Sequence, residues 1–235
     1  MSARARNTVG VALATLMVSA CASPGVTSTP SPATPSTPQP VSTELPRLPA
    51  SGPIDPGTYR MGTEPEVLVT IPPGWVSNGG MSLRKHLDQP NEVALDLYTA
   101  DIRVFADACQ SEGTEEPIGP TAEDLVAALV AQENSDISDP VDVTVAGLPG
   151  IRLEISAPAG LDVAQCSIGS LQIWVDREGG GGYLAGIGLE GTPPATVYVV
   201  DTPGGRLAFT PGGLDAAAAD IAERDAIIAS IEIVE

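Results

Sequence analysis

The sequence predicts an α+β fold, in which a largely antiparallel β-sheet packs with two main helices. Short segments in which every second residue is apolar follow one another along residues 58–235, as expected for half-buried strands. Two segments, near residues 121–130 and 215–230, instead have apolar residues at helical spacing. Strands in runs, with the helices set apart from them, are typical of α+β domains.

The first predicted strands lie between residues 66 and 105. Residues 66–71 form a strand that ends at the turn Pro72–Gly74. Residues 92–98 form a half-buried strand, because three apolar residues alternate along it, namely Val93, Leu95 and Leu97. Residues 102–105 are predicted to pair with this second strand.

The first helix is predicted to begin after Thr121. This threonine can act as the N-cap, and Glu123 and Asp124 lie in the first turn, where the helix dipole favours acidic residues. The apolar face of the helix is expected to consist of Leu125, Val126, Leu129 and Val130.

The second half of the domain is predicted to be richer in strands. Residues 141–145 and 151–155 alternate cleanly about Gly147–Gly150, which indicates a β-hairpin. The turn Thr202–Gly205 joins two more predicted strands. The full set of further strands is residues 171–175, 183–188, 197–200 and 207–210.

The second helix is predicted over residues 215–230, followed by a short strand over residues 231–234. Asp220 and Arg224 are four residues apart, a spacing that favours an ion pair along a helix. The buried stripe of the helix is expected to contain Ala217, Ile221 and Ile228.

The first 21 residues resemble a bacterial lipoprotein signal. Arg4 and Arg6 precede an uncharged stretch, residues 7–20, which is shorter than the roughly 20 residues a membrane span needs and fits a signal-peptide h-region. Its end, Val18-Ser19-Ala20-Cys21, resembles a lipobox. The resemblance implies lipid transfer to the Cys21 thiol, cleavage before it, and attachment to the membrane through acyl chains. Ordinary secretion is the alternative, since Ala20-Cys21-Ala22 also satisfies an A-x-A cleavage rule.

Residues 21–57 are predicted to be a disordered tether. Between Ala22 and Gly57, 21 of 36 residues are Pro, Ser or Thr, so the segment cannot bury enough apolar surface to offset its chain entropy. Proline favours an extended, semi-rigid spacer. The predicted organisation is therefore a lipoprotein signal peptide (1–20), a tether (21–57) and a single α+β domain (58–235).

The composition argues against several classes of function. The chain has 30 acidic and 11 basic residues and a net charge of −19, so like-charge repulsion argues against nucleic acid as a partner. Its aromatic residues (two Trp, four Tyr and two Phe) are too few for a stacking platform. His86 is the single histidine, which excludes a multi-histidine metal site. We therefore expect no cofactor and no metal.

Cys109 and Cys166 remain once Cys21 is lipidated. In an exported protein two such cysteines most simply form a disulfide. Two free buried thiols or a redox pair are the alternatives. The sequence contains no C-x-x-C, which argues against thiol-redox catalysis.

The remaining motifs favour structural roles, and no catalytic residue is predicted. Gly186–Gly191 matches G-x-G-x-x-G, but Thr192-Pro193-Pro194 follows where a dinucleotide site needs a helix. His86 lies in the basic cluster Arg84–His86, which is either a contact for an anion or carboxylate or a solvated turn. Two acidic groups lack the alternating pattern of a calcium loop and are expected to be solvated: Glu112, Glu115 and Glu116, and Asp136, Asp139 and Asp142.

Five segments in order carry a family resemblance. They are IPPGW (71–75), TAEDLVAAL (121–129), VTVAGLPGIRLEI (143–155), VYVVDTPGGRLAF (197–209) and, at the end of the last helix, IIASIEIV (227–234). With the predicted strands between them, they resemble the PsbP-like fold of the LpqN-type lipoproteins of actinobacteria, over residues 66–235. The resemblance implies a binding or assembly module and not an enzyme.

Together these features predict a lipoprotein anchored through Cys21 at the extracytoplasmic face of the cell membrane. Its domain is expected to bind an envelope protein or a small ligand without catalysing a reaction. A carboxylate-dependent envelope hydrolase is the alternative, because a catalytic pair of acids can be distant in sequence.

Overall fold

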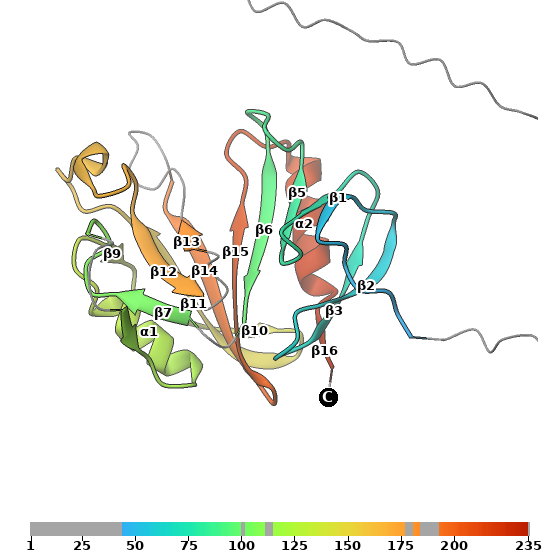
Figure 1. Ribbon diagram of the computed structural model, residues 1–235, viewed down its shortest axis with the longest axis horizontal. Coiled ribbons are helices and arrows are strands. Elements are labelled where there is room, and N and C mark those ends of the chain that lie inside the picture. Colours follow the sequence, from blue (N-terminus) through green and yellow to red (C-terminus); the bar gives the residue numbers. More distant parts are fainter. Residues whose placement is uncertain (1–43, 100–101, 111–114, 177–180, 184–192, 235) are drawn as a thin grey trace, which may run out of the picture. The chain divides into compact units, whose positions relative to one another are not determined.

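The computed structural model describes residues 44–99, 102–110, 115–176, 181–183 and 193–234 (Figure 1). The chain divides into two units, residues 1–42 and 43–235, and every described element belongs to the second. Cys21, the predicted signal peptide and most of the predicted tether lie outside the described residues. None of the described helices is both long enough and apolar enough to span a membrane.

The second unit is built on a nine-stranded sheet whose pairings are all antiparallel. In spatial order its strands are β1 (Ser51–Pro53), β4 (Val76–Asn78), β5 (Ser82–Lys85), β6 (Val93–Tyr98), β15 (Gly205–Gly212), β14 (Ala195–Thr202), β11 (Leu148–Ser156) and β10 (Val141–Val145), with β9 (Asp136–Ile137) also paired to β11.

Two smaller antiparallel sheets and two α-helices complete the described part, which confirms the α+β prediction. One sheet has the order β13 (Gly181–Tyr183), β12 (Gln172–Asp176), β7 (Ile102–Phe105), β8 (Glu115–Pro117). The other has the order β16 (Glu232–Ile233), β3 (Val67–Ile71), β2 (Gly57–Met61). The helices are α1 (Ala122–Val130) and α2 (Ala218–Ala229), and a 3₁₀ turn spans Val163–Gln165.

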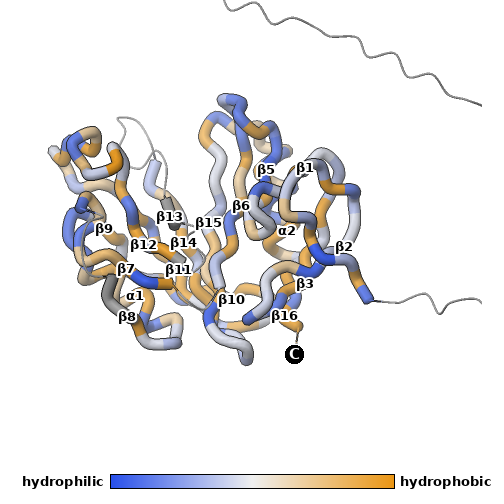
Figure 2. The backbone as a smooth tube through the Cα atoms, in the orientation of Figure 1, coloured by the Kyte–Doolittle hydropathy of each residue, from blue (hydrophilic) through white to orange (hydrophobic). Residues whose placement is uncertain are grey.

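The nine-stranded sheet separates two hydrophobic cores. Alternation along β14 sends Val197 and Val199 into the first core, with α1, β7 and β12, and Val200 into the second, with α2 and β3. Neighbouring residues of a strand point to opposite faces, so each face of the sheet needs its own cover. The hydrophilic stretches in Figure 2 include the turn between β5 and β6, at the end of the sheet.

The start of α1 is formed as predicted. Thr121 accepts a hydrogen bond from the Asp124 N–H, and the Asp124 carboxylate accepts from the Thr121 N–H, which is a reciprocal capping box. The hydrogen bonds from Thr121 lower the pKa of Asp124. Leu125 and Leu129 are buried, but the prediction for Val130 is wrong, because 55 % of it is exposed.

The second helix differs from its prediction. Ile227 is its buried residue, whereas Ile221 and Ile228 are half-buried and Ala217 is exposed. The predicted pair of Asp220 with Arg224 is also wrong, since Asp220 binds Lys85 and His86 and Arg224 binds other groups. Partners on β5 and β15 compete successfully with the weak pair along the helix.

Two strand predictions need correction. β7 pairs with β12 and β8 and not with β6, because Ile102 and Val104 belong to the first core and the apolar residues of β6 to the second. The predicted hairpin is present, but its turn is only Ala146-Gly147, both at positive φ, so residues 148–150 belong to β11. The predicted strand over 183–188 lies almost entirely outside the described residues.

The tether ends earlier than predicted. Leu48 and Ile54 are 8 % and 5 % exposed and belong to the second core. Residues 51–53 form β1, and the Leu48 N–H donates to the Arg60 carbonyl (2.9 Å). Residues 44–57, which we call the strap, are thus part of the folded unit. Composition missed them because two apolar side chains suffice to pack the strap, and its many prolines do not prevent this.

Candidate functional site

The central sheet splits at one end, between β14 and β15. The two strands pair only as far as Tyr198 and Phe209, whose rings stack with centroids 4.8 Å apart. Beyond this pair, β14 stays with β11 and β15 stays with β6. Figure 1 shows the two strands diverging.

Proline explains where the split begins. In the register of the two strands, Thr196 would face Pro211, and proline has no N–H to donate to a partner strand. Pro193 and Pro194, directly before β14, also lack this donor. The sequence therefore opens the sheet where a continuous ladder would otherwise close it.

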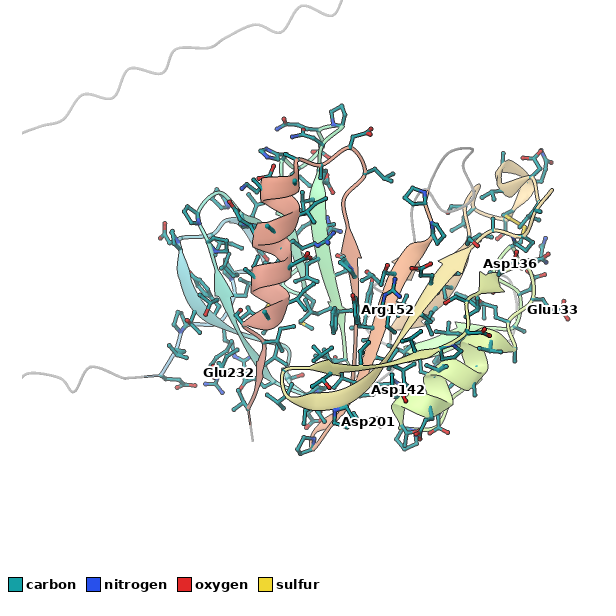
Figure 3. All side chains as sticks on the ribbon, turned by 180° about the vertical axis from the view of Figure 1, so that it is seen from behind. Glu133, Asp136, Asp142, Arg152, Asp201 and Glu232 are labelled. Carbon is teal, nitrogen blue, oxygen red and sulfur yellow. A yellow bond between two sulfur atoms is a disulfide. The ribbon has the colours of Figure 1, made fainter. Side chains whose placement is uncertain are left out.

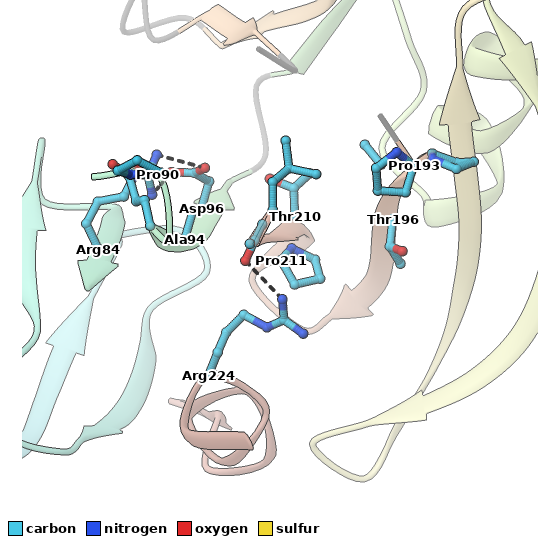
Figure 4. Close-up of a pocket in the computed structure, with 15 residues that line it drawn as sticks. Arg84, Pro90, Ala94, Asp96, Pro193, Thr196, Thr210, Pro211 and Arg224 are labelled. Atoms are coloured by element: carbon cyan, nitrogen blue, oxygen red, sulfur yellow. Dashed lines mark hydrogen bonds and ion pairs between the residues drawn. The ribbon is translucent and has the colours of Figure 1, made fainter. Parts of the chain in front are cut away.

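A cavity of about 470 Å³ lies in this split (Figure 4). Its size falls in the range of small-molecule sites. Apolar or glycine positions make up much of its wall: Pro90, Ala94, Pro193, Pro194, Ala195, Pro211, Gly212, Gly213 and Leu214. Its polar side chains are Arg84, Glu92, Asp96, Thr196, Thr210 and Arg224.

A second cavity of about 790 Å³ is lined by α2 and by the β10–β11 hairpin. It shares Thr196, Pro211 and Arg224 with the first. Arg152, which pairs with Glu154, lines only the second cavity. The two cavities therefore share part of their walls.

Arg84 organises one wall of the split. Its Nη1 lies 2.8 Å from Asp96 Oδ1, and its Nε lies 3.1 Å from Glu92 Oε1. Both carboxylates of the smaller cavity are therefore engaged by one guanidinium, which fixes the wall and offsets part of its negative charge.

The rest of the predicted basic cluster attaches α2 to β5. Lys85 Nζ lies 2.7 Å from both Asp220 Oδ1 and Glu223 Oε2, and His86 Nε2 lies 3.2 Å from Asp220 Oδ2. The hydrogen bond from Lys85 lowers the pKa of Asp220, and the bonds to Asp220 and Glu223 raise the pKa of Lys85. The cluster is therefore neither a solvated turn nor a shown contact for a ligand: its described partners are carboxylates of α2, and these ion pairs are structural.

The predicted disulfide between Cys109 and Cys166 is present. It joins the segment after β7 to the segment before β12, and both cysteines are buried. The neighbouring backbone reinforces this link, because the Ser167 N–H donates to the Cys109 carbonyl (2.9 Å). The bridge belongs to the first core and is not among the residues that line the two cavities.

The second predicted acidic group is exposed. Asp136, Asp139 and Asp142 all lie at the surface, and Figure 3 shows Asp136 and Asp142 on different elements. Within the described ranges, no three His, Cys, Asp or Glu residues are placed to hold a metal ion. Glu112, the side chains of Glu115 and Glu116, and the Gly186–Gly191 motif lie outside what the structure describes.

No family model and no curated protein matches the chain.

The site was missed at the level of sequence because its residues come from β5, β6, β14, β15 and α2. The signals that could have found it are the prolines beside predicted strands, Pro193-Pro194 and Pro211, since proline marks the end of a strand pairing.

Proposed function

We propose that this protein is a lipoprotein, anchored through Cys21 at the extracytoplasmic face of the cell membrane, whose domain binds a ligand in the split between β14 and β15. The PsbP-like resemblance is part of this proposal. The observation that carries it is the cavity of about 470 Å³ with an apolar wall and a few convergent polar side chains, which is the usual form of a small-molecule site.

The engagement of Glu92 and Asp96 by Arg84 favours binding over the carboxylate-dependent hydrolase. A hydrolase of that kind needs one carboxyl group to transfer a proton and the other to attack or activate water. Two carboxylates that share one guanidinium are better placed to stabilise the cavity wall.

The test uses the full chain expressed in a lipoprotein-processing bacterium. Small molecules that co-purify with the membrane-extracted protein are identified by mass spectrometry. Thr196→Trp should abolish their co-purification, because the indole fills the region that both cavities share. Thr63→Trp is the matched control, since Thr63 is exposed in the loop between β2 and β3 and lies outside both cavities.

The same preparations test the anchor. Cys21→Ser should leave the membrane fraction or remain as an unprocessed precursor. Retention of Cys21→Ser at its mature size in the membrane would refute the anchor. Equal ligand content in wild type and Thr196→Trp would refute the cavity.

A further inference from the structure

Arg224 occupies the region common to the two cavities. Its guanidinium has five N–H donors. Nη1 donates to the Gly212 carbonyl (2.9 Å), and Nε and Nη2 donate to Asp225 Oδ1 (3.0 and 2.8 Å). In the described part of the chain, two donors are left without a partner. Figure 4 shows the guanidinium extending from α2 toward the space between Pro211 and Thr196.

The pairing with Asp225 leaves Arg224 able to bind an anion. The Asp225 side chain is 58 % exposed, whereas that of Arg224 is 14 % exposed. An ion pair with an exposed carboxylate contributes little, because water competes for the carboxylate. The Arg224 guanidinium is largely shielded from water and has two donors without a partner in the described structure. A hydrogen bond from it to an anionic oxygen inside the cavity is therefore stronger than its ion pair with Asp225.

Two hydroxyl groups lie in the same cavity as the Arg224 guanidinium. Thr196 and Thr210 line the cavity, and neither side chain makes a hydrogen bond to any residue that the structure describes. Thr210 is 5 % exposed. Thr196 is half-buried, so both hydroxyls can bind a ligand oxygen or water that a ligand displaces.

The charge around Arg224 favours a ligand with a single negative charge. Glu92 and Asp96 line the same cavity, and Asp225 lies beside Arg224 in the larger one. A dianion such as a phosphate monoester would meet more repulsion from these carboxylates than a carboxylate would. The planar guanidinium also matches a carboxylate, which it can bind through two parallel hydrogen bonds.

We propose that the split binds a monocarboxylate with an apolar body. The carboxylate accepts hydrogen bonds from Arg224 and from the Thr196 hydroxyl, and the apolar body lies against Pro193, Pro194 and Pro211. The inference rests on the proposed function and narrows it to a ligand class. A free organic acid and the C-terminus of an apolar peptide share this chemistry.

Isothermal titration calorimetry of the full chain in detergent tests the proposal with two probe pairs. The first pair is octanoate and octanamide, which differ in charge and have the same tail. The second is the peptide Ala-Val-Pro-Leu with a free and with an amidated C-terminus. We expect the free carboxylate to bind at least tenfold more tightly than its amide in one pair or both, and the pair that responds identifies the source.

Three variants assign the effect to Arg224. Arg224→Gln should weaken carboxylate binding about tenfold or more and leave amide binding unchanged. Arg224→Lys should recover part of the loss, since it keeps the charge without the planar fork. Arg47→Gln is the matched control, because Arg47 is exposed on the strap and lies outside both cavities, and it should bind octanoate like the wild type.

Several results would overturn the proposal. They are equal binding of carboxylate and amide, unchanged octanoate affinity in Arg224→Gln, an equal loss in Arg47→Gln, or no binding of any carboxylate probe at millimolar concentration. If Thr196→Trp abolishes co-purification of a neutral molecule, the proposed binding function stands and the carboxylate assignment falls. Thermal melting of each variant separates loss of binding from loss of folding.

Discussion

The two sides of the central sheet are held together by different means. On the α1 side, a covalent bond between Cys109 and Cys166 joins the segments that flank β7 and β12. On the α2 side, the described contacts are non-covalent. They are the strap, residues 44–57, and the ion pairs of Lys85 and His86 with α2.

Because the links differ, the stability of each side should depend on different conditions. A disulfide responds to reductant and is indifferent to the length of the N-terminal segment. Ion pairs respond to pH and salt, and a packed strap responds to truncation. Residues of α2 line part of both cavities, so the proposed binding site borders the side of the sheet that has no described covalent link.

Truncation of the strap should lower the free energy of unfolding more than any other change. A smaller effect would contradict the view that the strap holds the α2 side together. A chain that begins at Gly57 loses the buried side chains of Leu48 and Ile54 and the pairing of β1 with β4. Burying each such side chain contributes about 1.5–3 kcal/mol, so the free energy of unfolding should fall by about 3–6 kcal/mol. Urea denaturation measures it.

The matched control is a chain that begins at Thr43, which keeps the strap and lacks the segment before it. Its unfolding free energy should equal that of the full chain. If the two truncated chains are equally stable, then the strap does not contribute to the second core.

Removal of the disulfide should have the next largest effect. The double variant Cys109→Ser/Cys166→Ser frees a loop of 57 residues, and loss of such a bridge costs roughly 2–4 kcal/mol. Thermal melting with and without reductant measures it, and reductant should destabilise the wild type to the level of the variant. Destabilisation of the variant by reductant would show that the bridge is not the redox-sensitive element.

The ion pairs of α2 should give the smallest effect, with a pH signature that the disulfide lacks. Because Lys85 lowers the pKa of Asp220 below its usual value of 3.8, the ionised form stabilises the fold above that value. The stabilisation is lost as the pH falls through the lower pKa of the folded state. Asp220→Asn should therefore melt at a lower temperature than the wild type at pH 7, with a difference that shrinks below pH 3.8.

Asp136→Asn is the control for this experiment, since Asp136 is exposed on β9. Its melting temperature should follow that of the wild type at every pH. A difference between Asp220→Asn and the wild type that does not vary with pH would attribute the effect to packing and not to charge.

Local patterns were enough to predict much of the fold. Alternation located β6, β10 and β11, because one buried face imposes a period of two on a strand. Thr121 with Asp124 located the start of α1, since a capping box is a short-range arrangement. The pairing of Cys109 with Cys166 followed from counting cysteines in a chain that is predicted to be exported.

The partners of these elements depended on the tertiary structure. The neighbours of β7, the burial of the strap and the true partners of Asp220 are contacts between segments far apart in the sequence. The candidate site is of the same kind, because Arg224 on α2 meets Thr196 on β14 and Pro211 on β15 only after folding. The sequence by itself determined the fold class, the helix cap and the disulfide, since local periodicity, capping and cysteine count are read along the chain. Only the packing of two faces of one sheet decided which segments meet and where the sheet opens.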